Sequence, residues 1–193
     1  MFKNLEHEDE TSSSADEEHI LFITQFIKIQ NEYREKHGAP ELELSEELTE
    51  QAQKWAEKLA ARQHVAYCEL PGIGENITFF PANMSPKDIV DYWYNEHRKY
   101  EYETPGWQPG TNYFTQIIWR STKEIGIGRK IVASDDSING CGFKVSSKHS
   151  QNNSSNHNQS NEKQIIVAFY RPAGNNNRAG QFAANVQKPI NGH

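Results

Sequence analysis

The apolar residues of this chain change their spacing once, near residue 120. Before that point they recur every three or four residues, which is the period of an amphipathic helix. After it, one stretch alternates apolar residues with glycines and basic residues, and a later stretch is continuously apolar, as is typical of β-strands. A chain in which helices precede strands favours an α+β fold with an antiparallel sheet.

Three helices are expected before the change. A capping box at Ser14–Glu17 opens the first, which should run to about residue 37. The second should start after Ser45. Ser85, followed by a proline, is a strong N-cap for the third, which should extend to about residue 102. The apolar stripes of the first two helices are Phe22, Phe26, Ile29 and Tyr33, and Leu48, Ala52, Trp55 and Leu59.

Shorter elements follow. Residues 65–84 contain several Pro and Gly breakers and should be irregular. At 111–120 we expect a short helix with the Thr111 hydroxyl as its N-cap. Strands are expected over 125–131 and 165–170, the second of them buried at the centre of the sheet.

The remaining segments set the domain boundaries. Gly140–Val145 is the candidate for one more short strand, and the polar residues 146–163 should form a flexible loop. The acidic residues 1–15 should be a disordered tail, and residues 186–193 a C-terminal tail. Between them, residues 16–185 suffice for one domain.

Charge and cysteine content exclude several classes of protein. The net charge of −6 is matched by residues 1–18 alone, so the rest is nearly neutral and nucleic-acid binding is not expected. The early apolar run Ile20–Ile29 follows acidic residues, so we expect neither a signal peptide nor a transmembrane segment. Cys68 and Cys141 are too few for a disulfide framework. These features predict a cytoplasmic protein.

Glu96 is the candidate functional residue that periodicity singles out. It shares a stripe with Ile89, Trp93 and Tyr100, spaced four, three and four residues apart, which puts its carboxylate on the apolar face of the third helix. A buried carboxylate must be paired, hydrogen-bonded or protonated. Glu96 is therefore either a chemically active group or a structural one tied to a backbone amide or an arginine.

Five motifs together resemble the CAP superfamily, which comprises cysteine-rich secretory proteins, antigen 5 and plant pathogenesis-related proteins. They are Asn31-Glu-Tyr-Arg34, Gly74-Glu-Asn-Ile77, Tyr92-Trp-Tyr-Asn-Glu96, Tyr113-Phe-Thr-Gln-Ile-Ile-Trp119 and Ala168-Phe-Tyr-Arg-Pro-Ala-Gly-Asn175. The likeness spans about residues 18–185. It is greatest to the intracellular, Golgi-associated subgroup, because Ala168 stands where secreted members carry a cysteine.

The resemblance implies a three-layer α-β-α sandwich around a central antiparallel β-sheet. It also implies a cleft of two His and two Glu, whose matching positions here are His64, Glu75, Glu96 and Tyr113. Tyr113 stands where the second His would be. Zn²⁺ prefers imidazole ligands, and a phenol with a pKa of about 10 ligates poorly at neutral pH. We therefore expect no metal cofactor, with His64 as the ligand if zinc binds, and a Tyr113 hydroxyl that donates to Glu75 or Glu96.

The function that the resemblance implies is non-enzymatic. We expect a lipid- or sterol-binding, regulatory module at the periphery of the Golgi or other membranes, with Phe79, Phe80 and Met84 as an apolar ligand groove. One alternative is a metal-dependent hydrolase of peptides or esters that uses His64, Glu75 and Glu96. The other is a homodimeric protein-interaction module.

Overall fold

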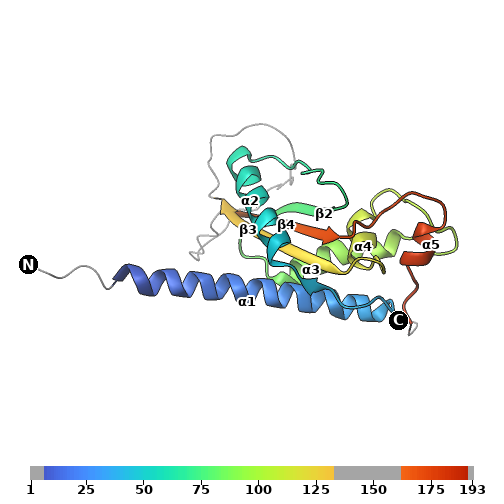
Figure 1. Cartoon of the computed structure of the whole chain (residues 1–193), viewed down its shortest axis with the longest axis horizontal. Coiled ribbons are helices and arrows are strands. Elements are labelled where there is room, and N and C mark those ends of the chain that lie inside the picture. Colours follow the sequence, from blue (N-terminus) through green and yellow to red (C-terminus); the bar gives the residue numbers. More distant parts are fainter. Residues whose placement is uncertain (1–6, 133–161, 191–193) are drawn as a thin grey trace, which may run out of the picture.

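The computed structural model of the chain describes residues 7–132 and 162–190. Its elements run from a long N-terminal helix to a short C-terminal one (Figure 1). They are α1 (His7–Lys36), β1 (Glu43–Leu44), α2 (Glu46–Arg62), β2 (Gly74–Pro81), α3 (Pro86–Tyr94), the 3-10 helix η1 (Asn95–Lys99), α4 (Asn112–Ile117), β3 (Glu124–Val132), β4 (Lys163–Arg171) and α5 (Gln181–Asn185).

The four strands form one mixed sheet in the order β1-β3-β4-β2. β4 lies between β3 and β2 and is antiparallel to both, which confirms the two predicted strands and the antiparallel centre of the sheet. β1 adds a fourth strand that pairs in parallel with β3, where Glu43 is opposite Glu124. With two residues, β1 is too short for any periodicity to predict it.

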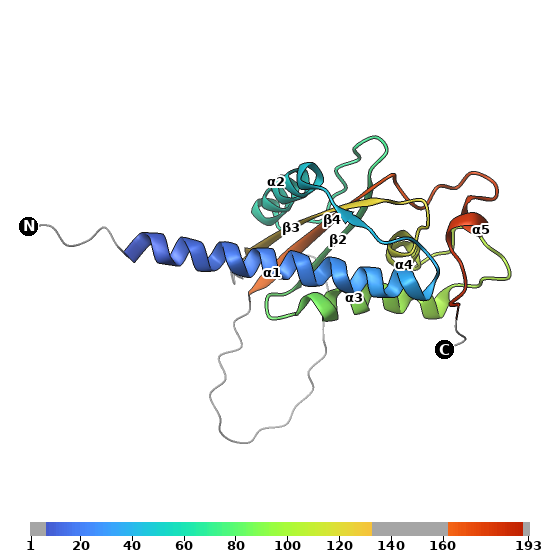
Figure 2. The same cartoon turned by 60° about the horizontal axis from the view of Figure 1, so that its bottom comes forward.

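Helices cover both faces of this sheet. Figure 2 shows α2 on one side of the strands and α1 with α3 on the other. On the α2 side, Leu48 and Leu59 pack against Val167 and Phe169 of β4. The expected α-β-α sandwich is thus confirmed, and the sheet supplies a core on each of its faces.

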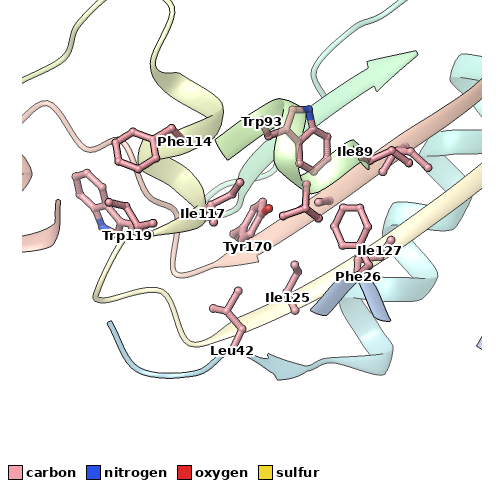
Figure 3. Close-up of a cluster of buried hydrophobic side chains, with 14 of the residues drawn as sticks. Phe26, Leu42, Ile89, Trp93, Phe114, Ile117, Trp119, Ile125, Ile127 and Tyr170 are labelled. Carbon is pink, nitrogen blue, oxygen red and sulfur yellow. The ribbon is translucent and has the colours of Figure 1, made fainter. Parts of the chain in front are cut away.

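The larger core lies between the sheet and the layer of α1, α3 and α4 (Figure 3). Trp93, Phe114 and Tyr170 are fully buried there. Burying these side chains removes apolar surface from water, and each Å² removed stabilises the fold by about 25 cal/mol. The Trp93 indole N–H donates to the Thr78 hydroxyl, so its one polar atom is also satisfied.

The backbone of α2 touches β3 directly at two glycines. A Cβ at Gly126 would lie 2.2 Å from the carbonyl carbon of Leu48, and one at Gly128 would lie 2.3 Å from that of Ala52. The alternation of isoleucines and glycines in this strand therefore has a packing cause. One face carries side chains into the larger core, and the other makes room for a helix.

Two helix starts agree with the prediction and two other boundaries do not. The Ser45 hydroxyl accepts the Leu48 N–H at the start of α2, and Ser85 forms a capping box at the start of α3. The first helix begins at His7 instead of Ser14, so residues 7–15 of the expected tail are helical. The third helix was expected to extend to about residue 102, but it ends at Tyr94 and is followed by the 3-10 helix η1, which ends at Lys99.

The expectation of an irregular segment over 65–84 is wrong for residues 74–81, which form β2. This strand pairs with β4 from Gly74, opposite Tyr170, to Pro81, opposite Lys163. A proline is compatible with a strand at the edge of a sheet. The breakers therefore mark the ends of a strand and not a continuous loop.

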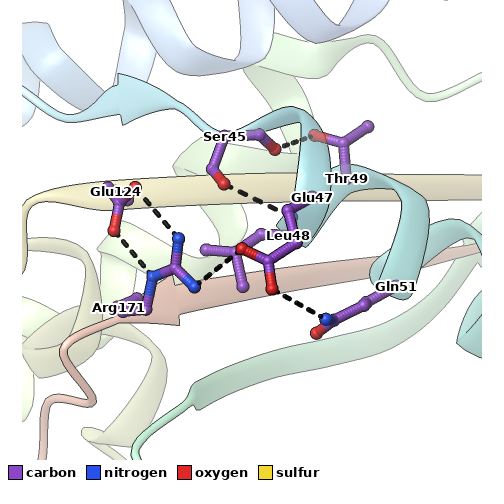
Figure 4. Close-up of polar contacts among 7 residues, drawn as sticks. All are labelled: Ser45, Glu47, Leu48, Thr49, Gln51, Glu124 and Arg171. Carbon is purple, nitrogen blue, oxygen red and sulfur yellow. Dashed lines mark hydrogen bonds and ion pairs between the residues drawn. The ribbon is translucent and has the colours of Figure 1, made fainter.

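Charged side chains join the start of α2 to the two central strands (Figure 4). The Arg171 guanidinium on β4 donates two hydrogen bonds to the Glu124 carboxylate on β3 and a third to Glu47 of α2. This cluster is partly exposed, so it fixes the relative position of the three elements more than it stabilises the fold.

Several predicted segments lie outside the described residues: 1–6 of the acidic tail, the candidate strand 140–145, Cys141 and nearly all of the polar loop. The expected C-terminal tail does contact the domain, because Val186 is buried and the Ile190 N–H donates to the Lys36 carbonyl. No helix in the described ranges combines the length and apolar character needed to cross a bilayer.

Replacing Gly128 by alanine should destabilise the domain by about 1–3 kcal/mol, since the added methyl group would overlap the backbone of α2. The free energy of unfolding from urea titration measures this. Gly106→Ala is the matched control, because no atom lies within 4 Å of the new methyl group. Equal stability of the two variants would contradict the close packing of α2 on β3.

Candidate functional site

A buried arginine organises the region around the cleft. Arg34, near the end of α1, is fully buried, and its guanidinium donates hydrogen bonds to the carbonyls of Pro40, Ile117, Trp119 and Thr122 at 2.7–2.9 Å. Burial lowers its pKa to about 10, so it remains charged at neutral pH. Arg34 therefore fixes the turn that follows α4 against the end of α1.

Its neighbours Asn31 and Gln30 also bind to groups far along the chain. The Asn31 amide accepts the Leu42 N–H and donates to the Leu42 carbonyl, as a second strand would. Gln30 accepts the Tyr170 hydroxyl in the core. The motif at residues 30–34 thus anchors α1 to the segment before β1 and to β4.

Glu96 lies in η1, and its carboxylate binds the start of α4. One carboxylate oxygen accepts the N–H groups of Tyr113, at 2.8 Å, and Phe114, at 3.2 Å. The first N–H groups of a helix have no partner within it, so this carboxylate caps α4 from outside. Thr111 was expected to be the cap, but that prediction is wrong: its hydroxyl donates to the Gln108 carbonyl.

Glu75 on β2 plays the same part for another segment. Its two carboxylate oxygens accept the N–H groups of Cys68, at 2.8 Å, and Glu69, at 2.7 Å. This pair of bonds holds the chain between α2 and β2, where Glu69 has a left-handed backbone with φ +57°. Glu96 likewise has the backbone-amide partners expected of a structural carboxylate, so the two carboxylates have similar surroundings.

Burial dominates the electrostatics of both carboxylates. Each is half-buried, and removal from water raises the pKa of Glu75 and of Glu96 more than the hydrogen bonds from N–H groups lower it. Cys68 beside Glu75 has a thiol whose pKa burial also raises, so the reactive thiolate is disfavoured. None of these three groups is activated as a nucleophile.

The Tyr113 side chain crosses to β2. Its ring centroid lies 5.6 Å from that of Trp93, and its hydroxyl donates to the Ile77 carbonyl at 3.0 Å. The expected bond from this hydroxyl to Glu75 or Glu96 is therefore wrong, because the backbone N–H of Tyr113 takes that place on Glu96. Burial also raises the Tyr113 pKa, which makes the metal-binding phenolate rarer still.

The residues expected to complete a metal cleft are not assembled as ligands. His64 is exposed, just beyond the end of α2. In the described residues, no group of three or more His, Cys, Asp or Glu side chains is placed to hold a metal ion. With both carboxylates bound to backbone amides and a neutral phenol at Tyr113, this donor set does not fit zinc.

The expected apolar groove is not assembled either. Adjacent residues of a strand point to opposite faces of the sheet. Phe80 accordingly enters the larger core, with Met84 at its edge, while Phe79 packs on the α2 side. The Phe80 ring also supports the exposed ring of Tyr92, at 5.3 Å between centroids.

Gln116 is a site residue that the sequence reasoning missed. Its side-chain oxygen accepts the Gly174 N–H, and a Cβ at Gly74 would lie 2.1 Å from that oxygen. The signal was available, since a glutamine between apolar residues of a short helix must find a buried partner. The Gln116 side chain thus contacts Gly74 and Gly174, and these three residues belong to three of the five motifs.

The sequence matches a known family model and curated proteins. The model described as "CAP: Cysteine-rich secretory protein family" matches residues 27–143. The Golgi-associated plant pathogenesis-related protein 1 of Homo sapiens is 33% identical over 171 residues, covering 87% of this chain and 94% of the human protein. Protein PRY2 of Saccharomyces cerevisiae is 31% identical over 86% of this chain, but only 41% of its own length is matched.

Solved structures show the same fold at low sequence identity. Venom allergen-like protein 4 of Schistosoma mansoni has a TM-score of 0.56 and 16% identity, with 86% of this chain and 94% of the other covered. The structure titled "NaASP2 with Zn2+" has a TM-score of 0.52 and 16% identity, with coverage of 87% and 85%. At these identities the likeness concerns the fold alone.

Truncating Glu96 to alanine should lower the free energy of unfolding by about 1–3 kcal/mol, because two N–H groups at the start of α4 lose their acceptor. Urea denaturation measures the loss. Glu101→Ala removes an exposed carboxylate nearby and should change stability by no more than about 0.5 kcal/mol. Similar losses in both variants would contradict the capping role.

The raised pKa of Glu96 also predicts a pH dependence. As the pH rises above 4.5, the unfolded chain releases the Glu96 proton while the folded protein still holds it. The free energy of unfolding therefore falls as the pH rises from 4.5 through the raised pKa of the folded protein. Glu96→Gln keeps an oxygen acceptor and loses the titration. Its stability relative to the unaltered protein should therefore increase from pH 4.5 to 7, and a decrease would contradict the raised pKa.

Proposed function

Because the chain belongs to the cysteine-rich secretory protein (CAP) family, we propose that it is a non-catalytic CAP domain that binds lipid at a membrane surface. The observation that carries the non-catalytic part is the use of both cleft carboxylates. Glu75 and Glu96 each bind a pair of backbone N–H groups, which favours a structural role for both carboxylates over a role as general base or metal ligand.

Exposed aromatic side chains support the lipid-binding part. Tyr67, before β2, and Tyr92, on α3, are both more than half exposed. Both lie close enough to the Tyr113 phenol to affect its pKa, so they belong to the same region of the surface. Tyrosine rings are favourable at a membrane–water interface, where the ring contacts lipid and the hydroxyl stays hydrated.

The name of one relative supports a location at the Golgi membrane. The human protein that resembles this chain over nearly its whole length is named Golgi-associated. The described part of this chain has no membrane-spanning helix. We therefore propose peripheral attachment to a Golgi or similar membrane, in which Tyr67 and Tyr92 contact the lipid headgroups and sterols or acyl chains are the ligands.

Flotation with phosphatidylcholine–cholesterol vesicles tests this proposal. The full chain should float with the vesicles equally at low and high salt, since phosphatidylcholine and cholesterol carry no net charge and most of the net charge of the chain lies in its first 18 residues. The double variant Tyr67→Ser/Tyr92→Ser should lose at least half of the bound fraction.

Trp107→Ser is the matched control, because Trp107 is about as exposed as the two tyrosines and lies in the loop after η1. It should float like the unaltered protein. No flotation with any vesicle composition would remove the lipid-binding proposal, and equal loss in the control would remove the assignment to Tyr67 and Tyr92.

Metal analysis tests the non-catalytic part separately. A chain purified without an affinity tag or chelator should contain far less than one zinc per molecule. Tyr113→His restores an imidazole beside Glu96 and should increase zinc affinity in a titration followed by calorimetry. Stoichiometric zinc in the unaltered chain, lost in His64→Ala, would instead favour the metal-dependent hydrolase.

A further inference from the structure

The outer edge of β3 is largely unpaired within the described residues. β1 pairs only with Glu124 and Ile125, and the chain then turns into α2. β3 continues to Val132 and is paired with β4 on its other side throughout. Beyond Ile125, no described strand covers the outer edge.

Two hydrogen bonds identify the backbone groups at this edge. The Ile125 carbonyl accepts the Ser45 N–H, and the Arg129 N–H donates to the Gln53 side-chain oxygen at 2.9 Å. Alternate residues of a strand direct their N–H and C=O groups to the same side. The groups of Ile127, Arg129 and Ile131 therefore all point outward, and a side chain of α2 caps one of them.

The edge lies in a groove between the two helical layers. A hollow of about 490 Å³ is lined by Glu18 and His19 of α1, Gln53 of α2, and residues 129–131 of β3. A second hollow of about 480 Å³ shares His19 and Gln53 with the first and extends toward Leu44 and the start of α2. Together they run along the line that β1 would follow if it were longer.

The two ends of the groove differ in charge. At the far end of β3, Arg129 forms an ion pair with Glu18 of α1, so the exposed Lys130 is the basic side chain left unpaired there, and burial lowers the pKa of His19. Along α2, the second hollow is lined by Glu46, Glu50, Glu57 and Lys54, and Lys54 forms an ion pair with Glu50. Glu46 and Glu50 lie where α2 begins, whereas Glu57 lies one turn beyond Gln53, toward the end of β3. The groove is thus acidic where α2 begins, and it has Lys130 as an exposed cation among mixed charges where β3 ends.

We propose that this groove binds an extended segment of a partner protein, which adds to β3 as an antiparallel strand with an acidic amino end and a basic carboxyl end. Backbone groups at a free strand edge give such a segment its affinity, and the flanking side chains give it specificity. In the antiparallel orientation, the acidic end lies over Lys130 and the basic end over Glu46 and Glu50. This inference is independent of the proposed lipid binding.

Fluorescence anisotropy of the full chain with a labelled six-residue peptide tests the proposal. The peptide has one acidic residue at its amino end, alternating Val and Thr in the middle and one lysine at its carboxyl end. It should bind saturably, whereas the same peptide with both end charges exchanged should bind at least tenfold more weakly. Gln53→Ala frees the Arg129 N–H and should tighten binding.

Ile131→Pro and Ile131→Ala form a matched pair, because both shorten an exposed side chain but only proline removes the outward N–H. Proline should weaken binding at least tenfold and alanine less than twofold, with melting temperatures recorded for both. Equal binding of both variants, equal binding of the charge-exchanged peptide, or no binding even by Gln53→Ala would overturn the proposal. So would sedimentation showing a dimer that Ile131→Pro abolishes, since a second copy would then occupy the edge.

Discussion

The interaction on which the rest of this domain depends is the burial of the Arg34 guanidinium among backbone carbonyls. Removing a charge from water costs several kcal/mol, so it is tolerated only where hydrogen bonds replace the lost hydration. Carbonyls before β1 and after α4 provide those bonds. The need to satisfy one buried cation thus brings together the end of α1, the segment leading to the sheet and the turn that starts β3.

The same principle accounts for the cleft. Glu75, Glu96 and Gln116 each satisfy backbone groups of a segment that lacks regular pairing. Around short helices and irregular segments, many N–H and C=O groups lack partners within their own element, and buried ones must be hydrogen-bonded. These residues resemble a catalytic set but support the fold through their hydrogen bonds, and the exposed Tyr67 and Tyr92 form the surface proposed to meet a ligand.

Much of the fold could be predicted, because periodicity and caps are local signals. Ser45 and Ser85 mark their helices, and the apolar run at 165–170 is the central strand. The site could be predicted only in part. That Glu96 is half-buried followed from spacing, but its partner did not, because the N–H of Tyr113 is brought to it by tertiary structure. β1 and β2 were not predicted for the same reason: each is a strand because it pairs with a neighbouring strand that lies far away in the sequence.

Amide hydrogen exchange at Tyr113 and Phe114 tests the central claim most directly. If the Glu96 carboxylate acts as a cap for α4, both amides should exchange slowly in the unaltered protein and in Glu96→Gln. In Glu96→Ala they should exchange much faster, while the amides of β4 stay protected. Equal exchange in all three proteins would contradict the structural role of Glu96.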